Sequence, residues 1–455
     1  MKSLKQFVYR MRPGAALIVS MIFVLVFSAL AVSLATVSGT NVQLANNQRQ
    51  VNYALTSAQS GLEVLRYYLT GLKVPGSVQP ADRLSAVAAA LTSKGFSASY
   101  TNHTLTVPTM IINTSSNQAF SATMICDADN DTVVADIIGT SLNEVTRKLR
   151  VTFNFENVGN NVFDFGIATK GPLKTKGSIE IEGLNERVEA SVYIESPNTL
   201  LALEMIGKSS IAGDVSIVNS LATVAIGNSS SIAGESGADA QDHVFIGVPP
   251  SEFPSPNPAE FAPFVQNTFI PGETPTSNVT LQNMRIPANA NPSFSGNVII
   301  NGVMFIEPPN AVTFNGNTQV TGVIVANGSL DAPSSGNSVQ FLGTVDSRDV
   351  NQLPNEGFAD LKEKKGTFLL APGFSTSFSG NFATINGVIA ASGIAFSGNA
   401  GGTINGSVVN YSDNTMTLDG NTDLIFNRSG SSTNPPGFGP SKVLRFQPSS
   451  YSEVM

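Results

Sequence analysis

The stretch "MRPGAALIVSMIFVLVFSALAVSLATVSG", residues 11–39, sets a long apolar run directly behind a short basic leader. No charged residue occurs between Pro13 and Gln48. A helix needs about 20 apolar residues to cross a bilayer, and residues 15–37 supply them. Because cytoplasmic flanks are enriched in Lys and Arg, we expect the leader to stay in the cytoplasm and the remainder to be exported. The cations of the leader are Lys2, Lys5, Arg10 and Arg12.

A secretory signal peptide is the first alternative, with Ala29-Leu30-Ala31 as its cleavage site. Signal peptides have a shorter apolar core, about 7–15 residues, and here the helical pattern continues past it. Apolar residues at helical spacing form one stripe, and Lys73, Pro75 and Gly76 then predict an end. The pattern therefore predicts one helix from about residue 15 to 72, although a coiled coil would also explain the stripe. Its members are Leu44, Val51, Leu55, Ala58, Leu62, Leu65, Leu69 and Leu72.

Two segments, "RPGAALIVSMIFVLVFSALAVS" and the later "YALTSAQSGLEVL" of Tyr53–Leu65, resemble the N-terminus of PilX-type minor pilins of type IV pili. The resemblance covers about the first 70 residues. It implies a class III leader, residues 1–14, which a prepilin peptidase cuts between Gly14 and Ala15 before methylating the new amino group. It also implies that the helix sits in the inner membrane before it assembles with other pilins or pseudopilins.

The fifth residue after this junction departs from the family. Major pilins usually carry Glu there, and the resemblance implies that this Glu meets the amine of a neighbouring subunit. Val19 has no carboxylate. Because tip subunits have no neighbour above them, Val19 favours a minor, tip-located subunit, and an uncleaved membrane anchor remains open.

Residues 77–160 have the pattern of a pilin-like α+β head that follows the helix of residues 15–76. Leu84, Val87 and Leu91 share one helical face, and Gly95 ends that helix. Strand-forming segments follow at residues 120–126, 132–138 and 145–155. The turn "DADND", residues 127–131, has the acidic spacing of a calcium loop, but it lacks the Gly and the final Glu that such a loop needs. It predicts a hairpin turn.

A repeat of about 20 residues dominates the rest of the chain. The motif Phe-x-Gly-Asn recurs every 18–22 residues where copies are adjacent, and a second motif such as Ile300-Asn-Gly302 follows several of them. Repeats of this length with β-branched residues predict a solenoid, here a right-handed β-helix over residues 161–428. Ser334–Asn337 is a weaker copy. The full copies are Phe294-Ser-Gly296-Asn297, Phe314-Asn-Gly316-Asn317, Phe378-Ser-Gly380-Asn381, Phe396-Ser-Gly398-Asn399 and Leu418-Asp-Gly420-Asn421.

The repeat predicts its own packing. We expect the apolar residue of each copy to stack inward, Gly or Asn to turn each corner at positive φ, and the Asn side chains to form a ladder. Proline-rich residues 248–263 cannot form a central strand and predict an excursion that continues to about residue 290. A second excursion with a short helix is expected at residues 349–372. Residues 429–455 form a tail, a loop with a closing strand at residues 442–448.

Composition narrows the chemistry. A net charge of −8 gives nucleic acid no basic surface, and the single Cys126 permits neither an internal disulfide nor a thiolate metal site. Polysaccharide enzymes need clustered acids with a base, yet residues 290–455 contain no His. The only dense group there is Asp346, Arg348 and Asp349. No cofactor, metal or catalytic residue is expected.

These patterns predict an exported, non-enzymatic protein that joins a pilin-like anchor and head to a β-solenoid. We expect it in the inner membrane first and then in a pilus-like fibre at the cell surface. There it would present the solenoid for adhesion or assembly, with a surface or polysaccharide ligand as a possible partner. The alternatives are a membrane-tethered β-helix enzyme acting on polysaccharide and a bactofilin-like solenoid that polymerises end to end.

Overall fold

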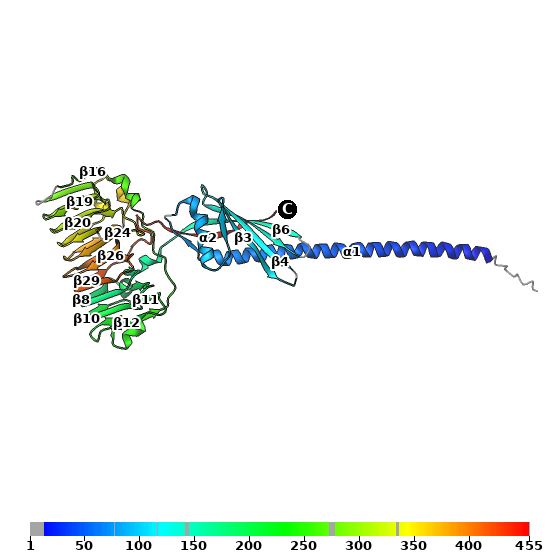
Figure 1. Ribbon diagram of the computed structural model, residues 1–455, viewed down its shortest axis with the longest axis horizontal. Helices are drawn as coiled ribbons and strands as arrows, with labels where there is room; N and C mark the ends of the chain where they lie inside the picture. Colours follow the sequence, from blue (N-terminus) through cyan, green and yellow to red (C-terminus); the bar gives the residue numbers. More distant parts are fainter. Residues whose placement is uncertain are drawn as a thin grey trace, which may run out of the picture. The chain divides into compact units, whose positions relative to one another are not determined.

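The computed structural model describes residues 13–76, 78–115, 117–141, 145–272, 278–333 and 336–454. They form two compact units, labelled in Figure 1. The first unit contains the N-terminal helix up to Leu72, residues 80–155 and residues from Leu444 onward. The second contains residues 73–79 and 156–443. The predicted leader, apart from Pro13 and Gly14, lies outside the described residues.

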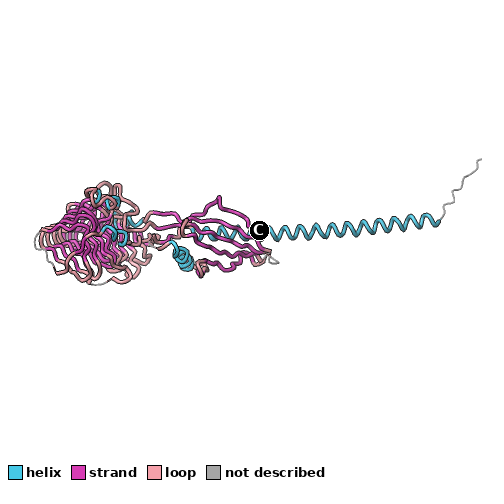
Figure 2. Tube along the Cα trace, turned by 90° about the horizontal axis from the view of Figure 1, so that it is seen from above, coloured by secondary structure: helices cyan, strands magenta, loops and turns pink. Residues whose placement is uncertain are grey.

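The first unit begins with helix α1, Pro13–Leu69, whose 57 residues span about 85 Å at 1.5 Å per residue. It is the long helix in the tube of Figure 2. The helix therefore ends three residues before the predicted Leu72. The predicted stripe is buried only in its later part, since Ala58, Leu62, Leu65 and Leu69 are buried whereas Leu44 is 66% exposed.

An antiparallel sheet packs against the second half of α1. Its strands lie in the order β30-β6-β5-β4-β3-β2, with the short strand β1, Lys73–Val74, paired beyond β30. Helix α2, Arg83–Ser93, buries Leu84, Val87 and Leu91 as predicted, after the 3-10 turn η1, Pro80–Asp82. The predicted strands of the head are confirmed. The strands are β2 Ser99–Thr101, β3 Thr104–Asn113, β4 Gln118–Asp127, β5 Thr132–Thr140 and β6 Thr146–Val158.

Small residues let α1 approach this sheet closely. A Cβ atom on Gly139 of β5 would lie 2.1 Å from the carbonyl oxygen of Ala54 and 2.2 Å from the amide nitrogen of Ala58. Because no real Cβ tolerates such contacts, glycine at this position sets the distance between helix and strand. The head of the first unit is thus built around α1.

The acidic turn between β4 and β5 is the predicted hairpin turn. Asp127 pairs with Thr132 in the antiparallel register, and its carboxylate accepts a hydrogen bond from the side chain of Asn130 at 2.8 Å. This bond lowers the pKa of Asp127. Asp131 forms an ion pair with Arg83 of α2. The turn is therefore held by side-chain partners within the protein.

The predicted closing strand at residues 442–448 is present but longer than expected. It belongs to strand β30, Ser441–Val454, which continues into the predicted tail loop. The Oγ of Ser450 accepts a hydrogen bond from the amide of Thr152 in β6 at 2.8 Å, and Arg66 of α1 stacks on the ring of Phe446. Pro448, Ser449 and Ser450 hid this continuation of the strand because Ser and Pro depress strand propensity. The larger segment of the second unit, residues 156–443, is therefore an insertion between two strands of the head.

The main sheet of the second unit consists of parallel strands, apart from the antiparallel pair of β13 and β14 among the described residues. In chain order they are β7 Ile167–Thr169, β8 Leu173–Gly183, β9 Val192–Ile194, β10 Leu201–Ile211, β11 Val215–Ile217, β12 Thr223–Ile226, β13 Ser231–Ile232, β14 Glu235–Ser236, β15 Val244–Ile246, β16 Asn267–Thr268, β17 Val279–Ile286, β18 Ser293–Phe294, β19 Val298–Ile306, β20 Ala311–Phe314, β21 Thr318–Ala326, β22 Ser338–Phe341, β23 Val345–Arg348, β24 Thr367–Phe378, β25 Thr384–Asn386, β26 Val388–Phe396, β27 Gly401–Asn405, β28 Val408–Asn410 and β29 Met416–Phe426.

The strands stack in an order that differs from chain order. The first long strand, β8, lies between β10 and the last strand of the unit, β29, in parallel register with both. From β29 the stack continues through β26, β24, β21 and β19 to β17. Figure 1 shows this succession from β16 to β12. The chain thus enters the stack at its middle, winds to one end, crosses to the other end and winds back.

The crossing segment is the proline-rich excursion. Its successive residues form hydrogen bonds with successive parts of the stack. The amide of Ser251 donates to the hydroxyl of Tyr193, and the hydroxyl of Tyr411 donates to the carbonyl of Pro254. The amide of Gln266 donates to the carbonyl of Asn283. In between, Glu260 of the 3-10 turn η6, Pro258–Phe264, pairs with Lys364 at 2.6 Å. The segment lies outside the strands, as predicted, but it ends near Gln266, not near residue 290, because β16 and β17 already belong to the stack.

Further 3-10 turns lie in segments that the sequence analysis assigned to excursions or to loops. The second excursion contains η7, Val350–Gln352, and η8, Leu361–Glu363, in place of the expected short helix. The others are η3 Asn161–Asp164, η4 Arg187–Ala190 and η5 Asp239–His243.

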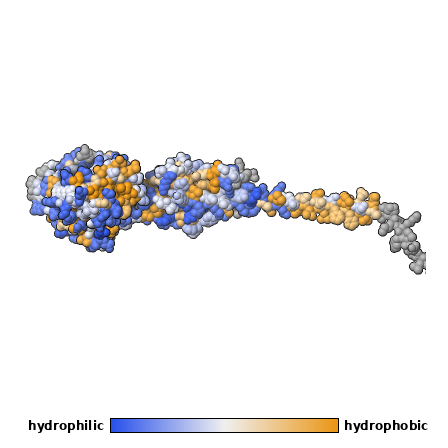
Figure 3. Space-filling model, turned by 90° about the horizontal axis from the view of Figure 1, so that it is seen from below, coloured by the Kyte–Doolittle hydropathy of each residue, from blue (hydrophilic) through white to orange (hydrophobic). Residues whose placement is uncertain are grey.

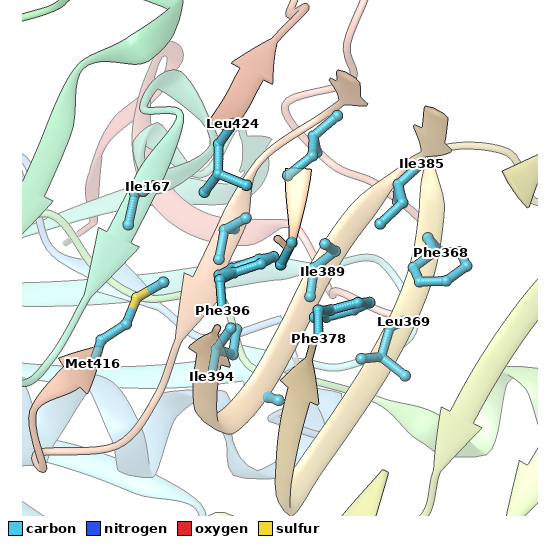
Figure 4. Packing of buried hydrophobic residues seen from close by; sticks show 14 of the residues in the cluster. Ile167, Phe368, Leu369, Phe378, Ile385, Ile389, Ile394, Phe396, Met416 and Leu424 are labelled. Atoms are coloured by element: carbon cyan, nitrogen blue, oxygen red, sulfur yellow. The ribbon is translucent and has the colours of Figure 1, made fainter. Parts of the chain in front are cut away.

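Phenylalanine rings form the spine of the core. Phe294, Phe314, Phe341, Phe378 and Phe396 stack nearly parallel, with neighbouring centroids 5.3, 5.0, 4.9 and 5.2 Å apart. All five are at most 1% exposed. Figure 4 shows Phe378 and Phe396 side by side within the larger cluster.

One copy of the repeat was assigned to the wrong residues. Phe341 pairs with Phe314, and Gly343 lies against the carbonyl of Gly316, so the true copy is Phe341-Leu-Gly-Thr344. The predicted copy at 334–337 begins outside the described residues, and its Asn337 is buried and accepts a hydrogen bond from the amide of Asn310. This copy was not recognised from the sequence because it has Thr344 in place of the final Asn.

Glycine in the repeat bears out the prediction only at the last copies, where Gly398 and Gly420 are at positive φ. Gly316, Gly343 and Gly380 are not at positive φ, but a Cβ on each would lie 2.2 Å from the carbonyl oxygen of the glycine one coil away. In the earlier coils the glycine therefore permits contact between coils. Positive φ also occurs in the second motif, as at Gly302 and Gly387.

The asparagine ladder also forms at the second motif. Asn405 donates to Asn386 at 2.7 Å, Asn427 donates to Asn405 at 2.9 Å, and Asn185 donates to Asn427 at 3.1 Å. The Asn residues of Phe-x-Gly-Asn are exposed instead, namely Asn297, Asn317, Asn381, Asn399 and Asn421.

Replacing Phe396 by Ala should loosen the stack locally. Truncation of a buried Phe costs about 3–5 kcal/mol, and in stacked coils that loss falls on neighbours. In the full chain in detergent, Phe396→Ala should reduce hydrogen-exchange protection in β24 and β29 and leave β4 and β5 unchanged. Asn399→Ala, an exposed position of the same repeat, is the control. Equal loss of protection in β4 and β5, or no change anywhere, would contradict this packing.

Candidate functional site

The first functional surface is the apolar half of α1. Its large apolar side chains are exposed on every side, for example Leu17 at 65%, Val26 at 49% and Leu34 at 68%. Figure 3 shows this part of the helix as a continuous hydrophobic surface. Among the described residues it is the one helix long and apolar enough to cross a membrane. Such a surface requires lipid or other apolar helices around it.

Two polar side chains of this segment are satisfied within the helix. The hydroxyls of Ser20 and Thr36 donate to the carbonyls of Leu17 and Val32 at 2.9 and 2.8 Å. Hydroxyls bonded in this way make no demand on water, which suits an apolar environment. Gly14 and Ala15 lie in the first turn of α1, although their side chains are not described. Val19 is 51% exposed and adds only an apolar contact.

The predicted group at residues 346–349 does not form one site. Nε of Arg348 lies 3.8 Å from Oδ2 of Asp346. Asp349 instead caps the turn η7, where its Oδ1 accepts a hydrogen bond from the amide of Asn351 at 2.9 Å. The two carboxylates also line different cavities of the second unit. The arrangement lacks the facing acid pair that glycoside hydrolysis uses.

A second acidic pair was not found from the sequence. Asp423 of β29 and Glu180 of β8 face each other in the parallel register. Burial, followed by the neighbouring Glu180, raises the pKa of Asp423.

The described residues contain no group of three or more His, Cys, Asp and Glu side chains that could hold a metal ion. His243 pairs with Asp214 at 2.8 Å at one end of the stack.

An open groove crosses the coils of the second unit. It encloses about 700 Å³ and runs from β17 to the corner after β24. The final residue of the repeat contributes in coil after coil, so Asn297, Asn317, Thr344 and Asn381 lie along it, with Asn278 at its first coil. These exposed side chains are the part of the repeat that the sequence placed in a ladder. They form instead a regular row of amides and hydroxyls on the surface.

Comparisons with known proteins give one family match and one structural match. The family described as PilX N-terminal matches residues 14–63. Among solved structures, the competence-associated pilin ComZ from Thermus thermophilus is similar with a TM-score of 0.25 and 11% identity, covering 89% of this chain and 97% of ComZ. No curated protein matches the sequence significantly. The family match contains the apolar half of α1 and its first turn.

Arg348 and Asp349 provide a test of catalysis. We expect the full chain in detergent to leave neutral and acidic polysaccharides intact, with or without Ca²⁺, because Asp349 caps a turn and does not join Asp346 and Arg348 in one acid–base group. The measurement is the release of reducing ends and of unsaturated sugars. Release that Arg348→Ala or Asp349→Ala abolishes would contradict this expectation and favour an enzyme.

Proposed function

We propose that the protein is a minor pilin-like structural subunit of a type IV pilus-related fibre, and that it displays its second unit on that fibre. The observation that carries the proposal is α1. Its first half is apolar on all sides, begins at the glycine of a basic leader, and matches the PilX N-terminal family over residues 14–63.

The same helix would serve twice. In the inner membrane its apolar half would span the bilayer, with the leader in the cytoplasm. After export the same surface would pack against the helices of other pilins, where apolar side chains again have no contact with water. The charge-free stretch from Pro13 to Gln48 suits both environments.

Position 19 supports a place at the tip. A subunit inside a pilin fibre would use a carboxylate here to meet a neighbouring amine, as the family resemblance implies. A buried carboxylate without such a partner is costly, and Val19 avoids that cost. The proposal therefore puts this subunit at the end of the fibre, where no subunit lies above it.

The displayed unit is proposed to be a β-solenoid of the right-handed β-helix type. The support is the parallel register between coils about 20 residues apart, the column of stacked Phe rings and the Asn ladder. Each coil buries its apolar face only through its neighbours. A rigid stack of this kind presents side chains at fixed spacing, which suits adhesion.

Processing tests the proposal most simply. The mature chain should begin with N-methylated Ala15, and Gly14→Ala should block cleavage, since the junction residue would no longer be glycine. Mass spectrometry of the N-terminus in the native host is the measurement. Gly39→Ala, a glycine of α1 with open space around its Cα, is the control and should be processed normally.

Two results would contradict the proposal. An intact Met1 terminus in the native protein would indicate a permanent anchor. A terminus near residue 32 would indicate a secretory signal peptide.

A further inference from the structure

The groove of the second unit is built from a repeated chemistry. Asn278, Asn297, Asn317, Thr344 and Asn381 stand one coil apart, and neighbouring parallel strands are about 4.8 Å apart. The five positions therefore cover roughly 19 Å in steps that a linear polymer could match. A row of this kind fits a ligand that repeats.

The amides in this row are available to a ligand. The described contacts give the side chains of Asn297 and Asn381 no hydrogen-bond partner within the protein, and both are exposed. Asn317 uses its Oδ1 to accept from Thr344 at 2.5 Å and keeps its amide protons free for another acceptor. Asn278 likewise uses its Oδ1 to accept from the backbone amide of Asn297 at 3.3 Å. The amides of Asn297 and Asn381 each offer a donor and an acceptor, which is also what a sugar hydroxyl offers in return.

Charge excludes a polyanion as the occupant. Asp346 is the only charged side chain among the described residues that line the groove. The nearby Arg348 is already engaged by Asp346 and, with the amide of Gln319 oriented toward it, by the Gln319 oxygen at 2.6 Å. Nucleic acid and acidic polysaccharide need unpaired cations, and this groove has none to offer.

Backbone pairing leaves no strand edge for an added peptide along the middle of the groove. An extended peptide binds by joining the free edge of a sheet. The groove floor is formed by β19 and β21, which lie inside the stack and pair on both sides. On β19, Ile299 is 38% exposed and gives the floor an apolar contact surface. Amides and hydroxyls around an apolar floor suit the mixed polar and apolar faces of a neutral sugar.

We infer that this groove binds a linear, neutral polysaccharide laid across the coils, with successive sugar residues held by the amides of successive Phe-x-Gly-Asn copies. This inference deepens the proposed display function and rests on it. The Phe of each copy builds the core, and the Asn of the same copy faces the ligand. One repeat therefore encodes both the scaffold and the binding surface.

Binding to immobilised full chain in detergent micelles tests the inference. The probes are dextran, galactomannan and xylan as neutral polymers, with polygalacturonate and double-stranded DNA for comparison. We expect binding of at least one neutral polymer, with an affinity that rises with oligosaccharide length and levels off once the chain spans the five coils. The combined variant Asn297→Ala, Asn317→Ala and Asn381→Ala should weaken binding by about tenfold or more, because three hydrogen-bonding groups are lost.

The matched control is Asn399→Ala with Asn421→Ala. These residues are exposed, hold the same position of the repeat, and lie outside the groove. The control should bind as the parent does. Absence of binding to all three neutral polymers, preference for polygalacturonate or DNA, or equal weakening by the control would overturn the inference. Incorporation into fibres, scored separately on the same variants, should not change, so failure of the display role is recognised independently.

Discussion

The parallel ladder between β8 and β29 is the contact on which the second unit depends. It joins the first long strand of the unit to its last, with Leu173 beside Met416 and Phe426 beside Gly183. The Asn ladder crosses the same junction through Asn427 and Asn185. The core is continuous as well, since Ile167, Met416 and Leu424, labelled in Figure 4, belong to one cluster of buried residues. Because no single coil is stable alone, this junction makes one stack of two halves.

The junction also explains how the unit can be an insertion. The chain enters and leaves the stack at neighbouring coils, so the head can continue from β6 to β30 around it. This arrangement requires the chain to cross from one end of the stack to the other. The proline-rich segment does this outside the strands, where missing amide protons are harmless. Its anchors are Tyr193, Tyr411 and the ion pair of Glu260 with Lys364.

The sequence predicted the contacts that recur in every copy of the repeat, but it did not predict the contacts that occur only once in the structure. The 20-residue period predicts parallel coils with Phe378 beside Phe396, because each copy meets the same surroundings. The β8–β29 junction has no repeat and could not be predicted. The strand at residues 442–448 was predicted, but its extension to Val454 was missed because Pro448, Ser449 and Ser450 resemble a loop. The groove was missed because the exposed Asn297 was assigned to a ladder that Asn405 forms instead.

Crosslinking across the β8–β29 junction tests the central claim of this fold directly. Lys176 and Asp419 are partners in the register, and paired strands lie within the reach of a disulfide. In a Cys126→Ser background, Lys176→Cys with Asp419→Cys should crosslink under mild oxidation as completely as Lys176→Cys with Ile206→Cys, its partner on β10. If only the Ile206 pair crosslinks, the coils stack in simple chain order, and the account of the inserted unit is wrong.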